Sequence, residues 1–242
     1  MKIVIPDLIW GVPSKYWDEL RSIGAEVYDD YPQNRENLLE RIKDAEIMTI
    51  NYFEGDKELI DSLPKLKYII SPAVGYDWID AEYAKSKGVK VLNCPTFVPL
   101  AVAEHAMALL LTLAKRIPEA HGSMKNGLWA PNDYVGFELS GKKLGLVGYG
   151  NIGKYLDKMA SGFGMSVEHV DSKSSSSELD ELLALSDVVC LCLPLDEKTR
   201  GLIDGRRLGL LKKTAYLINV ARGAIIDQGA LLESLQNNTI AG

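Results

Sequence analysis

Three glycines at a fixed spacing constrain the fold of this 242-residue chain more than any other feature of its sequence. Gly148, Gly150 and Gly153 form the motif GYGNIG, directly after the apolar run at residues 144–147 and before a helical stretch that starts near Ile152. The first glycine permits a tight turn, the second lets an anion approach the backbone, and the third lets a helix pack on the strand. We therefore predict a strand, a turn and a helix whose N-terminus faces a phosphate group.

An acidic residue ends the strand that we predict next. Asp171 closes the segment MSVEHVD, 18 residues after Gly153. A carboxylate here can accept hydrogen bonds from both ribose hydroxyls of a dinucleotide and would repel the 2′-phosphate of NADP. The alternative is a glycine-rich turn with a solvent-exposed aspartate, but the order of strand, turn, helix, strand and acid argues against it. The sequence thus predicts NAD, bound by Gly148, Gly150, Asn151, Ile152, Gly153 and Asp171.

Apolar runs alternate with helical stretches along the chain, which predicts an α/β protein with parallel sheets. The first part has strands at 2–6, 25–28, 46–50, 66–71 and 89–92, separated by helices at 14–23, 35–43, 56–63 and 80–87. A long apolar helix at 101–115 and a loop-rich segment at 126–140 interrupt this pattern, which restarts after Gly141. We place a domain boundary near Pro99, which gives domains 1–98 and 99–242.

Composition excludes several classes of protein. The formal net charge is −6 and the charges are mixed along the chain, so neither nucleic acid nor an anionic membrane is expected as a partner. No apolar run is long enough to span a membrane, and the start MKIVIP lacks the features of a signal peptide, which predicts a cytoplasmic protein. Of the three cysteines, Cys94, Cys190 and Cys192, the last two lie in the apolar run DVVCLCLPL and are interpreted as buried apolar residues, not as a disulfide or metal pair; no metal site is expected.

Five segments together resemble the D-isomer-specific 2-hydroxyacid dehydrogenases, a family that includes glyoxylate reductases, hydroxypyruvate reductases and phosphoglycerate dehydrogenases. They follow the family's order and approximate spacing: SPAVGYDWID (71–80), VAEHAMALLL (102–111), GYGNIG (148–153), SDVVCLCLPLDEKTRGLID (186–204) and INVARGAIID (218–227). The resemblance implies a flavodoxin-like substrate-binding domain at 1–98, a Rossmann NAD-binding domain at 99–242, and an active site in the cleft between them. It implies an NAD-dependent oxidoreductase that interconverts a small 2-oxo acid and a D-2-hydroxy acid.

The resemblance also implies roles for single residues. Arg222 matches the catalytic arginine, which holds the 2-oxo acid and polarises its carbonyl; a planar, permanently charged guanidinium suits this task. Val74 and Gly75 match the turn whose amides receive the substrate carboxylate, although an ordinary strand-to-helix turn is the alternative.

Further site residues are expected at the carboxyl ends of predicted strands. Asn51, Tyr52 and Phe53 follow the third strand of the first domain and would border the substrate, with simple packing as the alternative for the two aromatic residues. The remaining cofactor contacts are expected where the crevice of an open parallel sheet lies, at Pro194, Thr199, Asn219, Val220, Ala221 and Arg222.

Two residues of the family's catalytic unit have no counterpart in this sequence. The family uses a histidine that exchanges a proton with the substrate oxygen and a glutamate that orients it; both would lie beyond Gly242. His105, His121 and His169 occupy other positions.

The strand that would follow Gly242 is also missing. With an expected strand order of 3-2-1-4, the fourth Rossmann strand, at 215–219, would be an exposed apolar edge. We therefore expect a fragment, a truncated gene product or a sequence without its C-terminal part, with little or no turnover of its own.

A hypothesis from another class is a non-catalytic NAD-binding module for regulation or dimerisation, similar to the dehydrogenase-like corepressors. The missing acid and base favour this module, whereas Arg222 and the carboxylate turn favour the enzyme. The helix at 101–115 is apolar on more than one face. Together with the segment that reaches Trp129, it predicts a homodimer.

Overall fold

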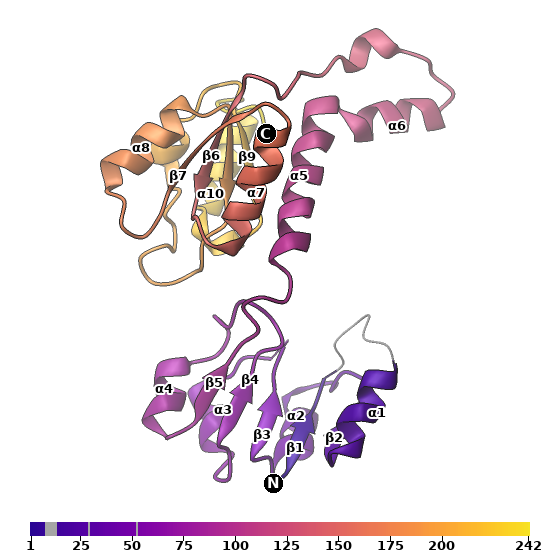
Figure 1. Cartoon of the computed structure of the whole chain (residues 1–242), viewed down its shortest axis with the longest axis vertical. Coiled ribbons are helices and arrows are strands. Elements are labelled where there is room, and N and C mark those ends of the chain that lie inside the picture. The colour runs from indigo at the N-terminus through magenta and orange to yellow at the C-terminus, as the bar shows by residue number, and fades with distance from the viewer. Residues whose placement is uncertain (8–13, 29, 52) are drawn as a thin grey trace. The chain divides into compact units, whose positions relative to one another are not determined.

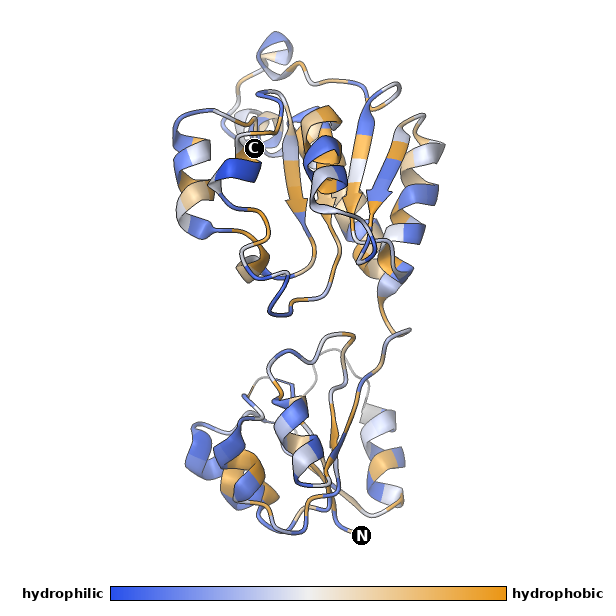
Figure 2. Ribbon diagram, turned by 90° about the vertical axis from the view of Figure 1, so that its left-hand side faces the viewer, coloured by the Kyte–Doolittle hydropathy of each residue, from blue (hydrophilic) through white to orange (hydrophobic). Residues whose placement is uncertain are grey.

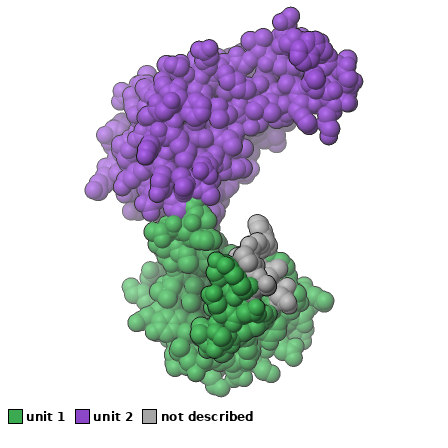
Figure 3. Space-filling model, turned by 45° about the vertical axis from the view of Figure 1, so that its right-hand side comes forward, with its two compact units in different colours: residues 1–98 green, residues 99–242 purple. Residues whose placement is uncertain are grey.

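The computed structural model of the chain describes residues 1–7, 14–28, 30–51 and 53–242. The chain divides into two compact units, Met1–Val98 (unit 1) and Pro99–Gly242 (unit 2), as Figures 1 and 3 show. Both units are built around parallel sheets covered by helices, which confirms the predicted α/β class.

Unit 1 contains a five-stranded sheet with the flavodoxin-like order β2-β1-β3-β4-β5. Its elements are β1 (Ile3–Ile5), α1 (Ser14–Ser22), β2 (Ala25–Val27), α2 (Arg35–Ile42), β3 (Ile47–Thr49), α3 (Lys57–Asp61), β4 (Tyr68–Ile70), α4 (Ala81–Ser86) and β5 (Lys90–Leu92). The strands are one to three residues shorter than predicted, since the ends of apolar runs continue into loops. The core lies between sheet and helices, with Val4, Leu38, Met48, Leu59 and Ile69 nearly inaccessible to solvent.

The carboxyl ends of β1 and β3 lie next to each other in unit 1, and the chain leaves them in opposite directions across the sheet. Such a divergence opens a crevice at the edge of a parallel sheet. Asp7 follows β1 and is fully buried, and its Oδ2 atom accepts a hydrogen bond from the backbone N–H of Asn51 at 3.2 Å. This bond joins the residues Asp7 and Asn51, which follow the two strands.

Unit 2 contains a four-stranded sheet with the order β7-β6-β8-β9. Its strands are β6 (Lys143–Val147), β7 (Ser166–Val170), β8 (Val188–Leu191) and β9 (Tyr216–Asn219). Its helices are α5 (Pro99–Lys115), α6 (Ile117–Lys125), α7 (Asn151–Gly162), α8 (Ser176–Leu185), α9 (Gly205–Leu208) and α10 (Gln228–Gln236), with 3-10 turns η1 (Pro131–Tyr134) and η2 (Gly223–Ile225).

The two faces of the unit 2 sheet are covered by different helices. Leu144 and Leu146 of β6 pack with α5 and α7, whereas Val147 packs with Leu182 of α8 and Leu208 of α9. A strand buried on both faces must be apolar throughout, and all four residues of β8 (VVCL) are apolar and buried. The strands of unit 2 show both hydrophobic and hydrophilic residues in Figure 2, and β7 (SVEHV) has three polar residues and is largely exposed.

The expected strand order 3-2-1-4 in the second domain is wrong. After β7 the chain crosses back over β6 through α8, so that β8 pairs with β6 on the side opposite β7. The third strand therefore lies beside the first, and β7 stands at the edge. The ends of β6 and β8 now diverge, which places the crevice between the glycine turn and the loop after β8.

The predicted open edge of β9 is partly covered. β9 is the last strand in the order of the sheet. The N–H of Leu217 donates to Gly242 O at 2.8 Å, and the N–H of Ala241 donates to Ala215 O at 2.9 Å. Residues 241–242 therefore already run along β9 with sheet-like hydrogen bonds.

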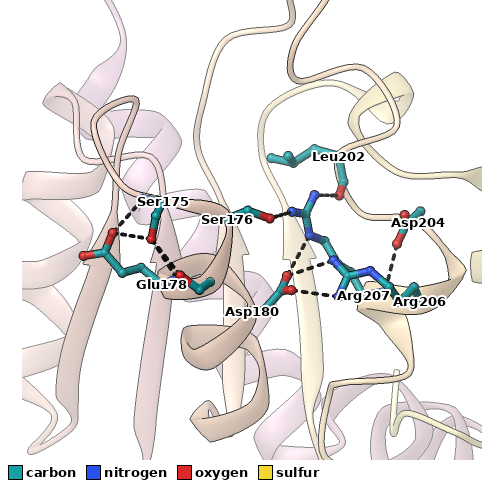
Figure 4. A network of polar contacts seen from close by, with 9 residues as sticks. Ser175, Ser176, Glu178, Asp180, Leu202, Asp204, Arg206 and Arg207 are labelled. Atoms are coloured by element: carbon teal, nitrogen blue, oxygen red, sulfur yellow. Dashed lines mark hydrogen bonds and ion pairs between the residues drawn. The ribbon is translucent and has the colours of Figure 1, made fainter.

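A network of ion pairs joins α8 to α9 (Figure 4). Asp180 Oδ2 accepts from Arg206 Nη1 at 2.7 Å, and Asp180 Oδ1 accepts from Arg207 Nε at 3.0 Å. Arg207 also donates to Ser176 Oγ at 2.8 Å and to Leu202 O at 2.7 Å. The two guanidinium groups lower the pKa of Asp180 to about 2.

We expect Asp180→Asn to lower the melting temperature of unit 2 at pH 7 and to have less effect as the pH falls. The carboxylate stabilises the fold above its pKa in the unfolded chain, about 3.9, and loses this effect as the pH falls towards its folded pKa of about 2. Thermal unfolding of the unmodified protein and of Asp180→Asn, measured from pH 7 down to about pH 2, checks the prediction. Glu181→Gln is the control, because Glu181 is exposed on the same helix and has no salt bridge among the described residues. If the two melting temperatures differ by the same amount at every pH, the ionised carboxylate of Asp180 is not the source of the stability.

Within the described residues, no helix is long and apolar enough to cross a membrane. The described histidine, cysteine and acidic side chains form no group of three or more that could hold a metal ion. All three cysteines are free thiols; Cys190 and Cys192 are buried as predicted, and Cys94 is half-buried.

Candidate functional site

The turn after β6 has the geometry that the glycine motif predicts. Gly148 has a φ of +101°, and a Cβ atom on it would lie 2.7 Å from Cys192 O, so no other residue fits. Its N–H donates to Val170 O at 2.8 Å. Its carbonyl accepts a hydrogen bond from Cys192 Sγ at 3.0 Å. Burial raises the pKa of the Cys192 thiol to about 12, so the thiol stays protonated and keeps donating at neutral pH.

The N-terminus of α7 is open towards solvent. Gly150 is the N-cap residue and supplies no side-chain cap for the N–H groups of the first turn. A Cβ atom on Gly150 would have no neighbour within 4 Å, whereas one on Gly153 would lie 2.7 Å from Gly148 O. The turn is therefore tightly packed at Gly148 and Gly153, whereas the space at Gly150, beside the N–H groups of Asn151 and Ile152, is open. This arrangement fits the pyrophosphate of a dinucleotide.

Tyr149, between the first two glycines, anchors this turn to the unit. Its ring stacks on His169 of β7 with a centroid distance of 3.6 Å. Its hydroxyl donates to Asp157 Oδ2 at 2.5 Å, and this bond raises the pKa of Tyr149. His169 is thus an aromatic neighbour of the turn, while His105 and His121 are exposed on α5 and α6.

Asp171 is exposed directly after β7. Its Oδ1 atom accepts from the N–H of Lys173 at 2.8 Å, and its own N–H donates to Ser174 Oγ at 3.1 Å. These local bonds fix the carboxylate at the end of the strand beside the glycine turn. Its position matches that of the acid that binds ribose in dinucleotide-binding folds.

The loop after β8 is closed by its own side chains. Thr199 Oγ1 donates to Pro194 O and accepts from the N–H of Asp196, both at 2.8 Å. Asp196 Oδ1 in turn accepts from the N–H of Thr199 at 2.9 Å. The Thr199 hydroxyl therefore holds the loop in shape, and Pro194 is exposed on it.

Asn219 shapes the turn that carries Arg222. Its Oδ1 atom accepts from the N–H of Ala221, and its Nδ2 atom donates to Arg222 O, both at 2.9 Å. The N–H of Val220 donates to Leu191 O at 3.2 Å and ties the turn to β8. The half-buried Arg222 is the N-cap residue of η2 and donates from Nη1 to Ala221 O at 3.2 Å. Predicted from the sequence as a cofactor contact, Asn219 already uses both ends of its amide on this turn.

The remaining predicted residues belong to unit 1. Val74 and Gly75 form a half-buried turn after β4, and Asn51 and Phe53 are half-buried after β3. Tyr52 lies outside the described residues. Unit 1 thus holds the residues predicted to bind substrate, and unit 2 holds those predicted to bind the cofactor, together with Arg222.

Some residues of the candidate site were missed from the sequence. Cys192 was interpreted as an apolar core residue, although its thiol also supports the glycine turn. Ser71 and Asn93 were not singled out, although both bind the turn at Val74 and Gly75. One signal was available, because Ser71 ends the predicted strand at 66–71 and Asn93 directly follows the predicted strand at 89–92, and site residues of parallel sheets collect at such strand ends.

Comparison with known proteins gives consistent matches. The model of the D-isomer specific 2-hydroxyacid dehydrogenase NAD-binding domain matches residues 107–242. Glyoxylate reductase of Pyrococcus furiosus is 36% identical over an alignment of 244 residues, and the alignment covers 93% of this chain and 70% of the relative. D-3-phosphoglycerate dehydrogenase of Methanocaldococcus jannaschii is 39% identical over 220 residues, which cover 85% of this chain and 42% of the relative.

Solved structures match over nearly the whole chain. An acyclic imino acid reductase in complex with NADPH and D-Arg has a TM-score of 0.92 at 32% identity, and the match covers 100% of this chain and 81% of the other. D-lactate dehydrogenase from Aquifex aeolicus, complexed with NAD and lactic acid, has a TM-score of 0.89 at 31% identity, covering 99% and 75%.

Proposed function

Because the chain belongs to the D-isomer-specific 2-hydroxyacid dehydrogenase family, we propose that it is an NAD-dependent oxidoreductase that interconverts a small 2-oxo acid and a D-2-hydroxy acid. The open approach to the backbone at Gly150, beside the uncapped N-terminus of α7, is the observation that carries this proposal. The hypothesis of a non-catalytic module is not favoured, since the similar proteins are named as reductases and dehydrogenases.

The cofactor would be held by unit 2 and would supply the hydride when bound. The N–H groups of Asn151 and Ile152 would bind its pyrophosphate, and Asp171 would bind ribose hydroxyls. Gly148 and Gly153 give the turn its shape. Pro194, Val220 and Ala221 would line the crevice, with Thr199 and Asn219 shaping its loops.

Arg222 would act on the substrate. Its guanidinium would bind the carbonyl oxygen of the 2-oxo acid and stabilise the negative charge that grows there during reduction. Arginine keeps its proton near neutral pH, so Arg222 would bind this oxygen without supplying its proton. In unit 1 the N–H groups at Val74 and Gly75 would hold the substrate carboxylate, and Asn51 and Tyr52 would border the substrate.

Titration of NADH tests the proposal directly. We expect saturable NADH binding by fluorescence, followed by binding of a small 2-oxo acid to the NADH complex. Glyoxylate is the first acid to test because several relatives are named glyoxylate reductase. Hydroxypyruvate and pyruvate follow, with oxidation of NADH as the readout of turnover. A chain that binds neither NADH nor any of these acids would refute the proposal.

We expect NADH to bind at least about tenfold more tightly than NADPH, and Asp171→Ala to narrow this gap mainly by improving NADPH binding. A carboxylate beside a 2′-phosphate is repulsive, and its removal relieves the repulsion. Titration of both cofactors into both proteins gives the four dissociation constants. Asp133→Ala is the control, because Asp133 is exposed on η1 of the same unit. Equal affinities of the unmodified protein for the two cofactors would contradict the role of Asp171.

We further propose a homodimer that uses α5, α6 and the segment to Trp129. In unit 2, α6 and η1 project away from the sheet (Figure 1). This region exposes apolar side chains, with Leu128 62% and Trp129 79% accessible. A second copy would remove this surface from water.

Sedimentation at micromolar concentration should therefore give a dimer for the unmodified protein. Trp129→Glu should shift it towards monomer, because a charge would be buried in the interface. Leu232→Glu is the control, since Leu232 is an exposed apolar residue on α10. A monomer in the presence of NAD would contradict the proposed dimer.

The three free thiols support the further proposal of a cytoplasmic enzyme, because that compartment keeps cysteines reduced.

A further inference from the structure

The turn after β4 has its carbonyl groups bound from inside unit 1. Three consecutive carbonyl oxygens accept hydrogen bonds from neighbouring strand ends: Ala73 O from the N–H of Cys94 at 2.9 Å, Val74 O from Asn93 Nδ2 at 2.8 Å, and Gly75 O from Ser71 Oγ at 2.8 Å. Two of the three donors are side chains. The turn is therefore held in one orientation by Ser71 and Asn93.

This orientation decides where the N–H groups of the turn point. The oxygen and the N–H of a trans peptide point in opposite directions, and the described residues contain no cis peptide. Since the carbonyls of Ala73, Val74 and Gly75 point to the N–H of Cys94 and to the side chains of Asn93 and Ser71, the N–H groups of Val74, Gly75 and Tyr76 point away from these donors. Within the described part of the chain, none of these three groups donates a hydrogen bond. Successive free N–H groups form a concave site for an anion.

We propose that Ser71 and Asn93 are positioning residues for the carboxylate of the substrate. This inference rests on the proposed function, which gives the turn its ligand. Neither side chain would touch the substrate; each would act through the carbonyl that it binds. Ser71 is fully buried and Asn93 is half-buried.

Loss of either donor would free a peptide group of the turn to rotate. A rotated peptide would present its carbonyl oxygen to the carboxylate, where an N–H is needed. The unpaired carbonyl would also favour this rotation, since a buried acceptor without a partner is costly. Substrate binding should then weaken, while the cofactor site in unit 2 keeps its structure.

The experiment measures binding of oxamate, an unreactive analogue of a 2-oxo acid, to the NADH complex by calorimetry. We expect Ser71→Ala and Asn93→Ala each to weaken oxamate binding about tenfold. The dissociation constant of NADH should stay within about twofold in both. Asn93→Asp keeps the shape but replaces the donor with an acceptor, and should weaken oxamate binding at least as much as Asn93→Ala.

Two matched controls lie in the same unit. Ser62→Ala removes the same kind of bond, from Ser62 Oγ to Leu59 O at 2.7 Å, at the end of α3. Asn34→Ala removes the cap of α2, where Asn34 Oδ1 accepts from the N–H of Asn37 at 2.9 Å. Both should lower the melting temperature and leave oxamate binding unchanged. If Ser71→Ala does not fold, the half-buried Asn93 carries the test.

The outcomes separate this inference from the proposed function. Normal oxamate binding by folded Ser71→Ala and Asn93→Ala would overturn the inference alone. An equal loss in the two controls, or a parallel loss of NADH binding, would also overturn it, because the effect would then be general destabilisation. If the unmodified protein binds NADH but no oxamate, the proposed substrate class fails and the inference fails with it.

Discussion

Arg222→Lys is expected to weaken oxamate binding to the NADH complex about 100-fold. Lysine keeps the positive charge but lacks the planar fork that can bind a carbonyl and a carboxylate oxygen together. Loss of such a charged contact typically costs about 2–5 kcal/mol of binding free energy, and a 100-fold change in the dissociation constant corresponds to about 2.7 kcal/mol. The turn itself should survive, because Asn219 binds the N–H of Ala221 and the carbonyl of residue 222 rather than its side chain.

Calorimetry with oxamate and fluorescence titration with NADH separate the two binding steps. NADH affinity should change little, because the phosphate and ribose contacts of the cofactor are expected elsewhere in unit 2. Arg200→Lys is the control, since Arg200 is exposed on the loop between β8 and α9. Unchanged oxamate affinity in Arg222→Lys would show that this arginine does not bind the substrate.

Gly150→Ala should lower NADH affinity about 100-fold and leave the melting temperature nearly unchanged. The backbone at Gly150 has a φ of −80°, which alanine adopts without strain, and the added Cβ atom would meet no protein atom within 4 Å. The methyl group would instead occupy the space through which a pyrophosphate reaches the N–H groups of α7. The fold should therefore tolerate the change while the cofactor does not.

Two other glycines complete this test. Gly148→Ala should lose stability as well as NADH binding, because it places a Cβ atom 2.7 Å from Cys192 O at a φ of +101°. Gly162→Ala, at the end of the same helix α7, meets no atom within 4 Å and should leave NADH binding unchanged. Normal NADH affinity in Gly150→Ala would place the cofactor away from this turn.

Much of the fold follows from the sequence because its signals are local. Apolar runs and helical periodicity predicted the strands and helices of unit 1 to within a few residues. The helix predicted at 101–115 begins at Pro99, since proline fits the first helical turn. The glycine spacing predicted the turn after β6, because a tight turn and a close packing contact depend on the residues at those positions.

The sequence predicts which residues belong to the candidate site better than it predicts what each side chain does there. Arg222, Val74 and Gly75 were assigned by resemblance to the family. Asn219 and Thr199 are predicted cofactor contacts, and the structure adds that their side chains close the loops that carry the site. A sequence shows that a polar residue follows a strand, but not whether its side chain turns to a ligand or back to its own loop.

The α/β class, the glycine turn and the acidic residue after β7 were predictable from the sequence, because each depends on neighbours in the chain. Features that depend on residues far apart in the chain became visible only in the folded structure. Crossing of the chain over β6 put β8 beside β6 and β7 at the edge, contrary to the expected order. Asn93 reaches Val74 across 19 positions, and Cys192 reaches Gly148 across 44. Such contacts form only when strands that are separate in sequence pair side by side, so no local pattern encodes them.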